Sequence, residues 1–253
     1  MKIPTCYVCS YPANDYRQRV GGGYSIIKCA MCGLEYTDPI PEPGTISSFY
    51  QNYRDIRADE EILRLNALEN LKMLARYGWT SESATLDFGA GKGAFLEVAG
   101  RNCYGVDIAG NVNERIKKSI DELYPLEFDF ITLWGVLEHL TDPKSTIRNL
   151  SRVLRGRGGV IALTTVNAEG LIPYYYKPPE HLTYWTRSAF DILARVTSMM
   201  VDSYVQYFMH QKSTVYLQRL LSRTPVEYVD YISGELPDTV FVPTNEVLVV
   251  LRK

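Results

Sequence analysis

Four of the five cysteines occur as two Cys-x-x-Cys pairs near the start of the 253-residue chain. Cys6 and Cys9 form the first pair, Cys29 and Cys32 form the second, and 19 residues separate them. Four thiolates at this spacing suit a tetrahedral Zn²⁺ ion between two short turns. The ion would be structural, because no coordination position stays open. An iron or redox role, or unpaired buried thiols, are the alternatives, and Cys103 is expected to be a buried small hydrophobe.

A glycine-rich segment joins a predicted strand to a predicted helix. It places an acid two residues before three alternating glycines, in the run Asp87-Phe88-Gly89-Ala90-Gly91-Lys92-Gly93. Glycines remove the Cβ atoms that would keep a ligand from the backbone, and the helix start offers N–H groups to an anion. Asp107 ends the next predicted strand, where a carboxylate can accept both hydroxyls of a ribose. With Ala94 as a third position, the loop also fits a nicotinamide or flavin dinucleotide.

Two of the three histidines fall in loops that follow predicted strands. His139 follows the strand predicted at 128–133, and His181 lies in the loop after the strand predicted at 159–165. Because ligands bind outside the carboxyl ends of parallel strands, both are candidates for a general base toward a hydroxyl acceptor. Capping or orienting a loop is the alternative for each. His210 follows a β-rich stretch and is expected to be structural.

The elements that must position these residues alternate between strand-like and helix-like patterns from residue 81 onward. This alternation predicts an α/β fold in which helices cover a parallel sheet. An amphipathic helix at 58–76 is expected to cover the sheet as well. Strands are predicted at 84–88, 102–107, 128–133, 159–165, 199–208 and 246–251, a weak strand near 119–122, and helices at 93–100, 143–154 and 186–197.

Three zones divide the chain. Residues 1–40 carry the cysteine pairs, residues 41–80 form a connector with the amphipathic helix, and residues 81–253 form the α/β domain. The first zone is too short for a core of its own, so zinc would stabilise it by on the order of 10–16 kcal/mol. Within the last zone, 211–243 separates the final two strands. This insertion is a candidate cap over an acceptor pocket or a contact surface of a homodimer.

Composition and charge narrow the class of protein. The chain has 27 Lys and Arg residues against 29 Asp and Glu, a net charge of −2, which argues against a protein held mainly by nucleic-acid phosphates. No apolar stretch reaches the ~18–20 residues of a membrane span, and the N-terminus lacks a secretory signal. These features predict a cytoplasmic protein, and in a reducing compartment paired cysteines favour a metal over a disulfide.

Several motifs in a fixed order resemble those of a known family. The acid–glycine loop comes first, and the others are the runs Trp134-Gly135-Val136-Leu137-Glu138-His139-Leu140, Asp142-Pro143 and Arg152-Val153-Leu154-Arg155-Gly156-Arg157-Gly158-Gly159. Together they resemble the class I S-adenosylmethionine-dependent methyltransferases over roughly residues 81–210. The resemblance implies a Rossmann-like sheet with helices on both faces.

The resemblance also implies how S-adenosylmethionine is held. Asp107 would bind the ribose hydroxyls, Asp87 the amino group directly or through water, and Ile108 the adenine. The stretch between Asp107 and Phe128 is shorter than in the family and lacks the usual acid for the adenine amino group. The methionine portion and the border of the cofactor would contact Gly89, Ala90, Gly91, Gly93, Trp134 and Gly135.

A second resemblance concerns the N-terminal zone. Its second cysteine pair continues as Cys-Gly-Leu-Glu-Tyr-Thr-Asp-Pro, and Tyr50 and Tyr53 follow. This pattern is similar to bacterial methyltransferases that carry a zinc ribbon before the catalytic domain and act on sugars or secondary metabolites. The resemblance implies that Tyr50 and Tyr53 reach the cofactor, with packing of the ribbon onto the sheet as the alternative. The loop around His181 resembles the stretch that lies above the methyl group in these enzymes.

The sequence therefore predicts an S-adenosylmethionine-dependent methyltransferase that acts on a small-molecule or sugar acceptor by in-line displacement. One alternative is an RNA methyltransferase that grips RNA through its ribbon, which the net charge disfavours. Another is a non-catalytic S-adenosylmethionine-binding subunit with a regulatory or assembly role, which the short segment after Asp107 leaves open.

Overall fold

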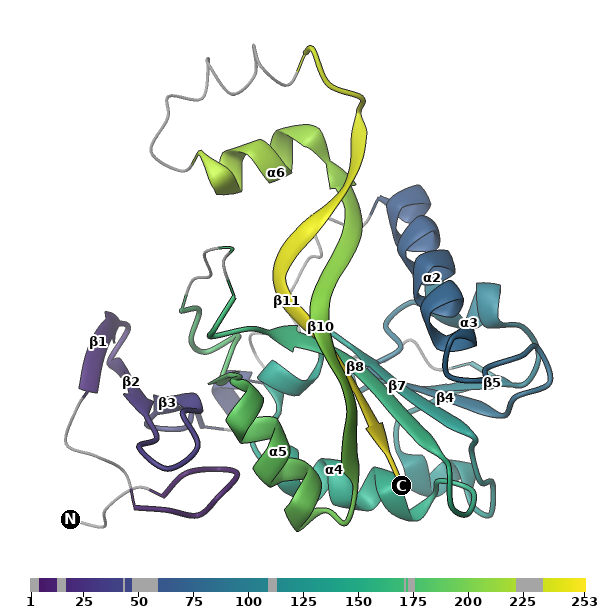
Figure 1. Ribbon diagram of the computed structural model, residues 1–253, viewed down its shortest axis with the longest axis horizontal. Helices are drawn as coiled ribbons and strands as arrows, with labels where there is room; N and C mark the ends of the chain where they lie inside the picture. Colours follow the sequence, from purple (N-terminus) through teal and green to yellow (C-terminus); the bar gives the residue numbers. More distant parts are fainter. Residues whose placement is uncertain are drawn as a thin grey trace.

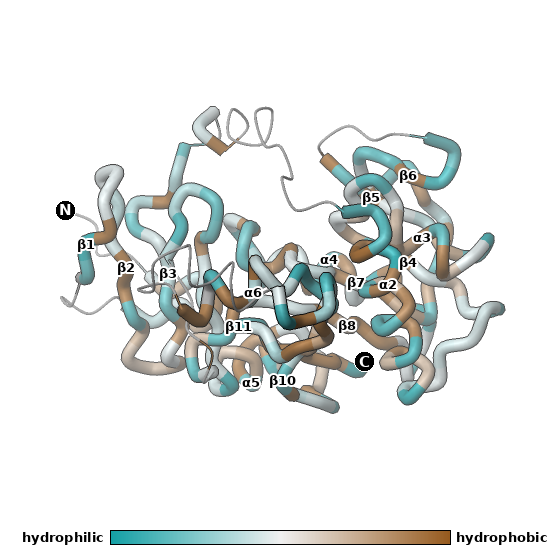
Figure 2. The backbone as a smooth tube through the Cα atoms, turned by 90° about the horizontal axis from the view of Figure 1, so that it is seen from above, coloured by the Kyte–Doolittle hydropathy of each residue, from teal (hydrophilic) through white to brown (hydrophobic). Residues whose placement is uncertain are grey.

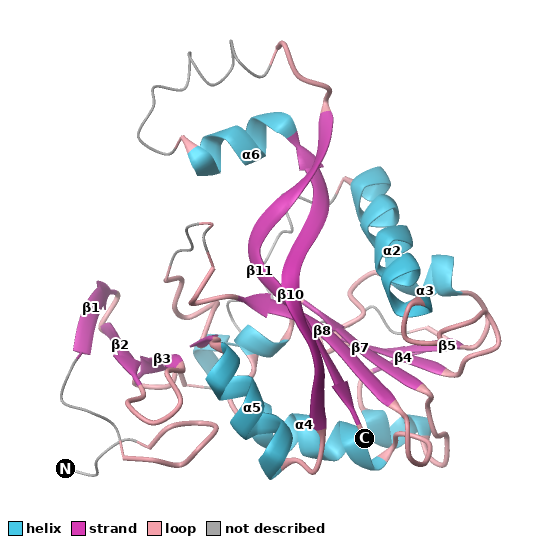
Figure 3. Cartoon of the chain, viewed as in Figure 1, coloured by secondary structure: helices cyan, strands magenta, loops and turns pink. Residues whose placement is uncertain are grey.

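The computed structural model describes residues 5–12, 17–42, 44–46, 59–108, 113–170, 172, 176–221 and 234–253. Tyr50 and Tyr53, which were predicted to approach the cofactor, lie outside the described residues. The strands form two sheets, one of seven strands and one of four (Figure 3). In the part of the chain that is described, no helix is long and apolar enough to cross a membrane.

The seven-stranded sheet confirms the predicted α/β, Rossmann-like fold. Its strand order is β10-β11-β8-β7-β4-β5-β6. The five strands from β8 to β6 run parallel, whereas β11 runs antiparallel to both β8 and β10. The strands are β4 (Thr85–Phe88), β5 (Cys103–Val106), β6 (Ile116–Lys117), β7 (Phe130–Trp134), β8 (Val160–Val166), β10 (Met200–Lys212) and β11 (Thr239–Arg252).

Helices cover both faces of this sheet (Figure 1). The buried residues of α4 and α5 join one hydrophobic cluster, and those of α2 and α3 join another on the opposite face. Every residue of β8 is buried between these layers, and Figure 2 shows hydrophobic stretches along the central strands. The helices are α2 (Glu60–Ala75), α3 (Ala94–Ala99), α4 (Pro143–Arg152), α5 (Arg187–Val196) and α6 (Ser213–Leu220), with 3₁₀ turns η1 (Ile120–Leu123) and η2 (Leu137–His139).

The strand predicted near 119–122 is wrong. The edge strand is β6, which lies just before that position and pairs with β5. Residues Ile120–Leu123 form the 3₁₀ turn η1 instead, because Ser119 and Glu122 make a capping box that starts a helical turn. The final strand also begins earlier than predicted, at Thr239.

The four-stranded sheet combines the N-terminal zone with a segment from the α/β region. Its strands are β1 (Arg17–Gly21), β2 (Tyr24–Lys28), β3 (Glu35–Asp38) and β9 (Thr183–Tyr184), in that order. All pairs are antiparallel, and β3 places Glu35 opposite Tyr184 and Tyr36 opposite Thr183. The N-terminal sheet is therefore completed by β9, from the segment between β8 and α5.

The two sheets also share a core. Cys29, Cys32 and Tyr36 belong to the same buried cluster as Trp185 and Phe190. The side chain of Thr186, which caps the start of α5, donates a hydrogen bond to the carbonyl of Cys32 at 2.8 Å. The cysteine-bearing turn is thus fixed to the helix that follows β9.

The two strands of the β10–β11 hairpin are longer than the other strands of the sheet. Glu246 pairs with Val166, the last residue of β8, so the part of β11 before Glu246 extends past the carboxyl end of β8. Figure 1 shows this arm rising from the body of the molecule with α6 near its tip. The insertion predicted at 211–243 therefore starts from the carboxyl edge of the sheet.

Helix α2 is pinned to the edge strand β10 by two asparagines. The Asn66 side chain donates to the carbonyl of His210 at 3.0 Å and accepts from its N–H at 2.6 Å. The Tyr207 hydroxyl donates to the Asn70 side chain at 2.9 Å. The bonds from Asn66 satisfy backbone groups of His210 on an edge strand, and the His210 ring packs against Phe241, with ring centroids 4.8 Å apart.

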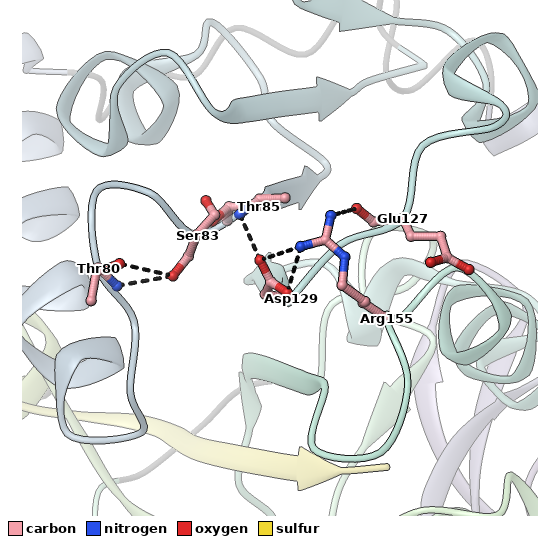
Figure 4. Close-up of polar contacts among 7 residues, drawn as sticks. Thr80, Ser83, Thr85, Glu127, Asp129 and Arg155 are labelled. Atoms are coloured by element: carbon pink, nitrogen blue, oxygen red, sulfur yellow. Dashed lines mark hydrogen bonds and ion pairs between the residues drawn. The ribbon is translucent and has the colours of Figure 1, made fainter.

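Polar contacts tie together the loops at the amino ends of the strands (Figure 4). Asp129 accepts hydrogen bonds from the Ala84 N–H and from Arg155 Nη1. Arg155 also donates to the carbonyl of Glu127, and the Thr80 N–H donates to Ser83 Oγ in the neighbouring loop. This network lies at the end of the sheet opposite the glycine-rich segment.

We expect Asn66→Ala to lower the free energy of unfolding by about 1–3 kcal/mol, because it leaves polar groups of β10 without partners. Asn149→Ala in α4 is the matched control, since Asn149 is exposed and the change in helix propensity is the same. The control should stay within about 0.5 kcal/mol of the parent. Urea unfolding measures both, and equal effects would contradict a pinning role for Asn66.

Candidate active site

The candidate residues converge where the parallel strands end. From β4 the chain proceeds to β5 on one side, whereas β7 pairs with β4 on the other side. The order of strands thus reverses direction next to β4, and ligands of such sheets bind in the crevice at that point. The glycine-rich segment follows β4, Asp107 follows β5, and Gly135–His139 follow β7.

The glycine-rich segment has a backbone that side chains would not tolerate. Gly89, Gly91 and Gly93 all have positive φ, at 86°, 53° and 89°. A Cβ on Gly89 would lie 2.4 Å from a methyl carbon of Val136, so the loops after β4 and β7 touch there. A Cβ on Gly91 would meet no atom within 4 Å. Gly91 therefore presents bare backbone on the open side of the loop.

Asp107 connects this segment to the end of β5. Its Oδ2 accepts a hydrogen bond from the Gly91 N–H at 2.8 Å. Its own N–H donates to the carbonyl of Lys117 in β6. The next side chain, Ile108, is 78% exposed. The two predicted contacts for the ribose and adenine thus lie at the rim of the crevice.

Asp87 lies beneath the segment and is buried. Its Oδ1 accepts a hydrogen bond from the Thr132 hydroxyl at 2.7 Å. Burial raises the pKa of Asp87, the Thr132 hydrogen bond opposes this rise, and the nearby charge of Asp107 adds to it, so that the pKa is about 7. Burial and, to a smaller extent, the charge of Asp87 raise the pKa of the Cys103 thiol. The site therefore disfavours a negative charge on Asp87 until a cation approaches.

Trp134 is the last residue of β7, and Gly135 follows it. The Trp134 ring packs against Phe95 of α3, with ring centroids 5.6 Å apart. Gly135 has a φ of 63°, and its N–H donates to the Thr164 hydroxyl at 2.9 Å. A Cβ on Gly135 would lie 3.8 Å from Glu138 Oε1, so the Glu138 carboxylate turns back toward this strand end.

Glu138 is a site residue that the sequence reasoning passed over. It is 3% exposed, and the Thr165 hydroxyl of β8 donates to its Oε2 at 2.8 Å. Burial raises the pKa of Glu138 to about 7. The sequence feature that could have indicated Glu138 is an acid next to His139 in an otherwise apolar run after a predicted strand. Glu138 is in contact with β8 and with Leu182, which are far from it in sequence, and a local pattern does not show this.

The two histidines predicted as catalytic candidates lie together. The rings of His139 and His181 have centroids 4.9 Å apart and are nearly perpendicular. His139 Nδ1 lies 2.8 Å from the carbonyl oxygen of Glu180, and a carbonyl only accepts. Nδ1 therefore carries the proton, and the lone pair of neutral His139 is on Nε2. Burial lowers the pKa of His139, which favours this neutral form.

The loop that carries His181 is held between the two sheets. The Leu182 N–H donates to the carbonyl of Glu138 at 2.7 Å. The Thr37 N–H donates to the carbonyl of Leu182, and the Thr37 hydroxyl donates to the carbonyl of His181. Strand β3 of the N-terminal sheet thus fixes one of the two histidines.

The four predicted metal ligands also come together. The sulfur atoms of Cys6, Cys9, Cys29 and Cys32 all lie within 4.8 Å of one another, and two Sγ–Sγ pairs are 3.5 Å apart. A tetrahedral zinc ion with sulfur at ~2.3 Å needs sulfur separations of about 3.8 Å. Each pair sits in a tight turn that ends at a residue with positive φ, Ser10 in the first and Gly33 in the second. The cluster fits a zinc ribbon in ligand type and spacing.

We expect the ionisation of Asp87 to lower the free energy of unfolding as the pH rises. The folded-state pKa, about 7, lies above the unfolded value of ~3.9. The stabilising contribution of the protonated carboxyl is therefore complete below about pH 4 and lost as the pH rises through about 7. Asp87→Asn cannot ionise and should remove this dependence.

Urea unfolding of both proteins between about pH 5 and 8 measures the difference, and the parent should lose on the order of 2 kcal/mol relative to Asp87→Asn. A constant difference across this range would show that Asp87 ionises normally in the folded state.

Comparison with known proteins shows which family the chain belongs to. A family model described as a methyltransferase domain matches residues 50–203, well over half of the chain. No curated protein matches the chain significantly.

Solved structures share the fold at low identity. One is the 1,6-didemethyltoxoflavin-N1-methyltransferase of Burkholderia thailandensis with bound 1,6-didemethyltoxoflavin and S-adenosylhomocysteine, with a TM-score of 0.52 and 17% identity over 94% of this chain and 98% of that chain. Another is a chain from the complex between the Haloferax volcanii Trm112 methyltransferase activator and the putative methyltransferase, with a TM-score of 0.52 and 15% identity over 76% of this chain and 90% of that chain. The match to the family model shows that the chain belongs to the methyltransferase-domain family and carries an S-adenosylmethionine-dependent methyltransferase domain.

Proposed function

We propose that this protein transfers a methyl group from S-adenosylmethionine to a small-molecule or sugar acceptor. The observation that carries the proposal is the crevice after β4, β5 and β7, where the glycine-rich backbone, Asp107 and the buried Asp87 meet. The acceptor class comes from the resemblance to methyltransferases with a zinc ribbon, and the net charge of −2 disfavours a polyanionic acceptor such as RNA.

The residues of the crevice fit S-adenosylmethionine by type and exposure. Asp107 lies at the rim and offers its carboxylate to the ribose hydroxyls, and the exposed Ile108 side chain offers an apolar face to the adenine. Asp87 is a buried carboxyl that a cation would stabilise in its charged form, as the amino group of the cofactor would. The methionine portion would lie along Gly89, Ala90, Gly91 and Gly93, with Trp134 and Gly135 as the border and Tyr50 and Tyr53 as further contacts.

When bound, S-adenosylmethionine supplies a methyl group on a positively charged sulfur, and S-adenosylhomocysteine remains after transfer. The acceptor atom forms the new bond to the methyl carbon with its own electron pair, while the electron pair of the broken carbon–sulfur bond stays on sulfur. A hydroxyl or amine acceptor also loses a proton. His181 and His139 are the groups that we assign to activating the acceptor for this step.

We also propose that the N-terminal zone holds a structural zinc ion. We assign Cys6, Cys9, Cys29 and Cys32 as its ligands, residues 1–40 as the ribbon, 41–80 as the connector and 81–253 as the catalytic domain, with 211–243 as the acceptor cap. The ribbon supports the site through β3, which pairs with β9 and bonds the His181 loop.

We expect Asp107→Ala to weaken S-adenosylhomocysteine binding at least ~100-fold, because a charged hydrogen-bond acceptor is worth about 1.5–3 kcal/mol and the Gly91 loop loses its anchor. Isothermal calorimetry measures the binding. Asp191→Ala, an exposed carboxylate of α5, should bind as the parent does. Unchanged affinity in Asp107→Ala would remove this site as the cofactor site.

We expect Cys32→Ser to reduce bound zinc from one ion per chain to nearly none and to lower the melting temperature. The reason is that the turn at Cys32 is bonded to Thr186 and lies in the core shared with α5. Elemental analysis and thermal unfolding measure these effects. Cys103→Ala is the matched control and should keep one zinc ion, whereas zinc retention by Cys32→Ser would contradict the ribbon assignment.

A further inference from the structure

We propose that Glu138, His139 and His181 form a second metal site, for a divalent first-row transition ion, separate from the cysteine site. One ligand atom from each of these residues lies within 4.8 Å of the other two. An ion bound at ~2.1 Å by nitrogen and oxygen needs ligand separations of about 3.4 Å, so small side-chain rotations bring the three atoms into range.

The setting of His139 is that of a metal ligand. Metal-binding imidazoles donate their second ring N–H to a carbonyl or carboxylate, which fixes the tautomer and the ring orientation. Here Nδ1–H donates to the carbonyl of Glu180 at 2.8 Å, which places the lone pair on Nε2. His181 lies beside it, with the ring centroids 4.9 Å apart.

The setting of Glu138 calls for a positive charge. The carboxylate is 3% exposed, and its hydrogen bond from Thr165 comes from a neutral hydroxyl. A buried carboxylate is costly unless it is paired with a cation or coordinates a metal. An ion held between Glu138 and the two imidazoles would supply that charge.

The ligands are carried by segments that are bonded to each other. Glu138 and His139 belong to η2, and His181 belongs to the loop before β9. The Leu182 N–H donates to the carbonyl of Glu138 at 2.7 Å, and Thr37 of β3 bonds the carbonyl of His181. This support limits relative movement of the ligands, which a defined coordination geometry requires.

The three ligands of this site differ from the four cysteines of the ribbon because they leave coordination positions on the ion open. Two imidazoles and one carboxylate suit Zn²⁺, Fe²⁺, Co²⁺ or Ni²⁺. Three protein ligands leave coordination positions open, as in catalytic sites, whereas four thiolates close the ribbon site. Because their lone pairs would be on the ion, the two histidines would then activate the acceptor through the ion rather than as general bases. The ion would bind the acceptor oxygen and lower its pKa. This use, unlike the binding of the ion, rests on the proposed function.

Cobalt binding tests the proposal. Protein that carries one zinc ion per chain in the ribbon is titrated with Co²⁺ and followed by calorimetry and visible absorption. We expect one further ion per chain with weak visible bands and no sulfur-to-cobalt charge-transfer band, because no thiolate is involved. His181→Ala and Glu138→Gln should each weaken this binding at least ~10-fold.

His210→Ala is the matched control, because His210 is the third histidine of the chain and lies on β10; it should bind cobalt as the parent does. The ribbon zinc content and circular dichroism show that each variant is folded, and the stoichiometry of the parent decides the question if a variant is not. No cobalt beyond the ribbon ion, or equal binding by parent, His181→Ala and Glu138→Gln, would overturn the second site. That result together with intact S-adenosylhomocysteine binding would leave the proposed function standing.

Discussion

Two buried carboxylates at the carboxyl edge of the sheet set the chemistry of this protein. Asp87 and Glu138 follow the same plan, since each accepts a hydrogen bond from a threonine hydroxyl on a neighbouring strand, Thr132 or Thr165. Burial raises the pKa of both to about 7. A hydroxyl orients a carboxylate without neutralising it, so the folded crevice is built to receive positive charge.

The rest of the structure holds these groups in place. Glycines allow the loops after β4 and β7 to touch, where Gly89 meets Val136. The loop that carries His181 is bonded on one side to the carbonyl of Glu138 and on the other to Thr37 of the N-terminal sheet. The N-terminal zone is therefore bonded to the segment that carries His181, and we propose that a metal in its cysteine cluster stabilises this contact.

The sequence predicted what depends on local chemistry. The alternation of strands and helices, the cysteine pairs and the loops at Asp107 and His139 were readable because each depends on residues close together in the chain. The pairing of β3 with β9, the burial of Glu138 and the length of the β10–β11 arm were not, because each depends on segments far apart in sequence. The strand expected near 119–122 failed because the Ser119–Glu122 capping box outweighed a weak strand pattern.

Calorimetry of S-adenosylhomocysteine binding in buffers of low and high ionisation enthalpy, at about pH 6.5, tests the central claim most directly. We expect one ligand per chain and a buffer-dependent enthalpy in the parent, because the cationic amino group lowers the pKa of Asp87 and releases its proton. Asp87→Asn should lose the buffer dependence, and NAD should not bind. Binding of NAD instead, or an enthalpy that is the same in both buffers, would contradict it.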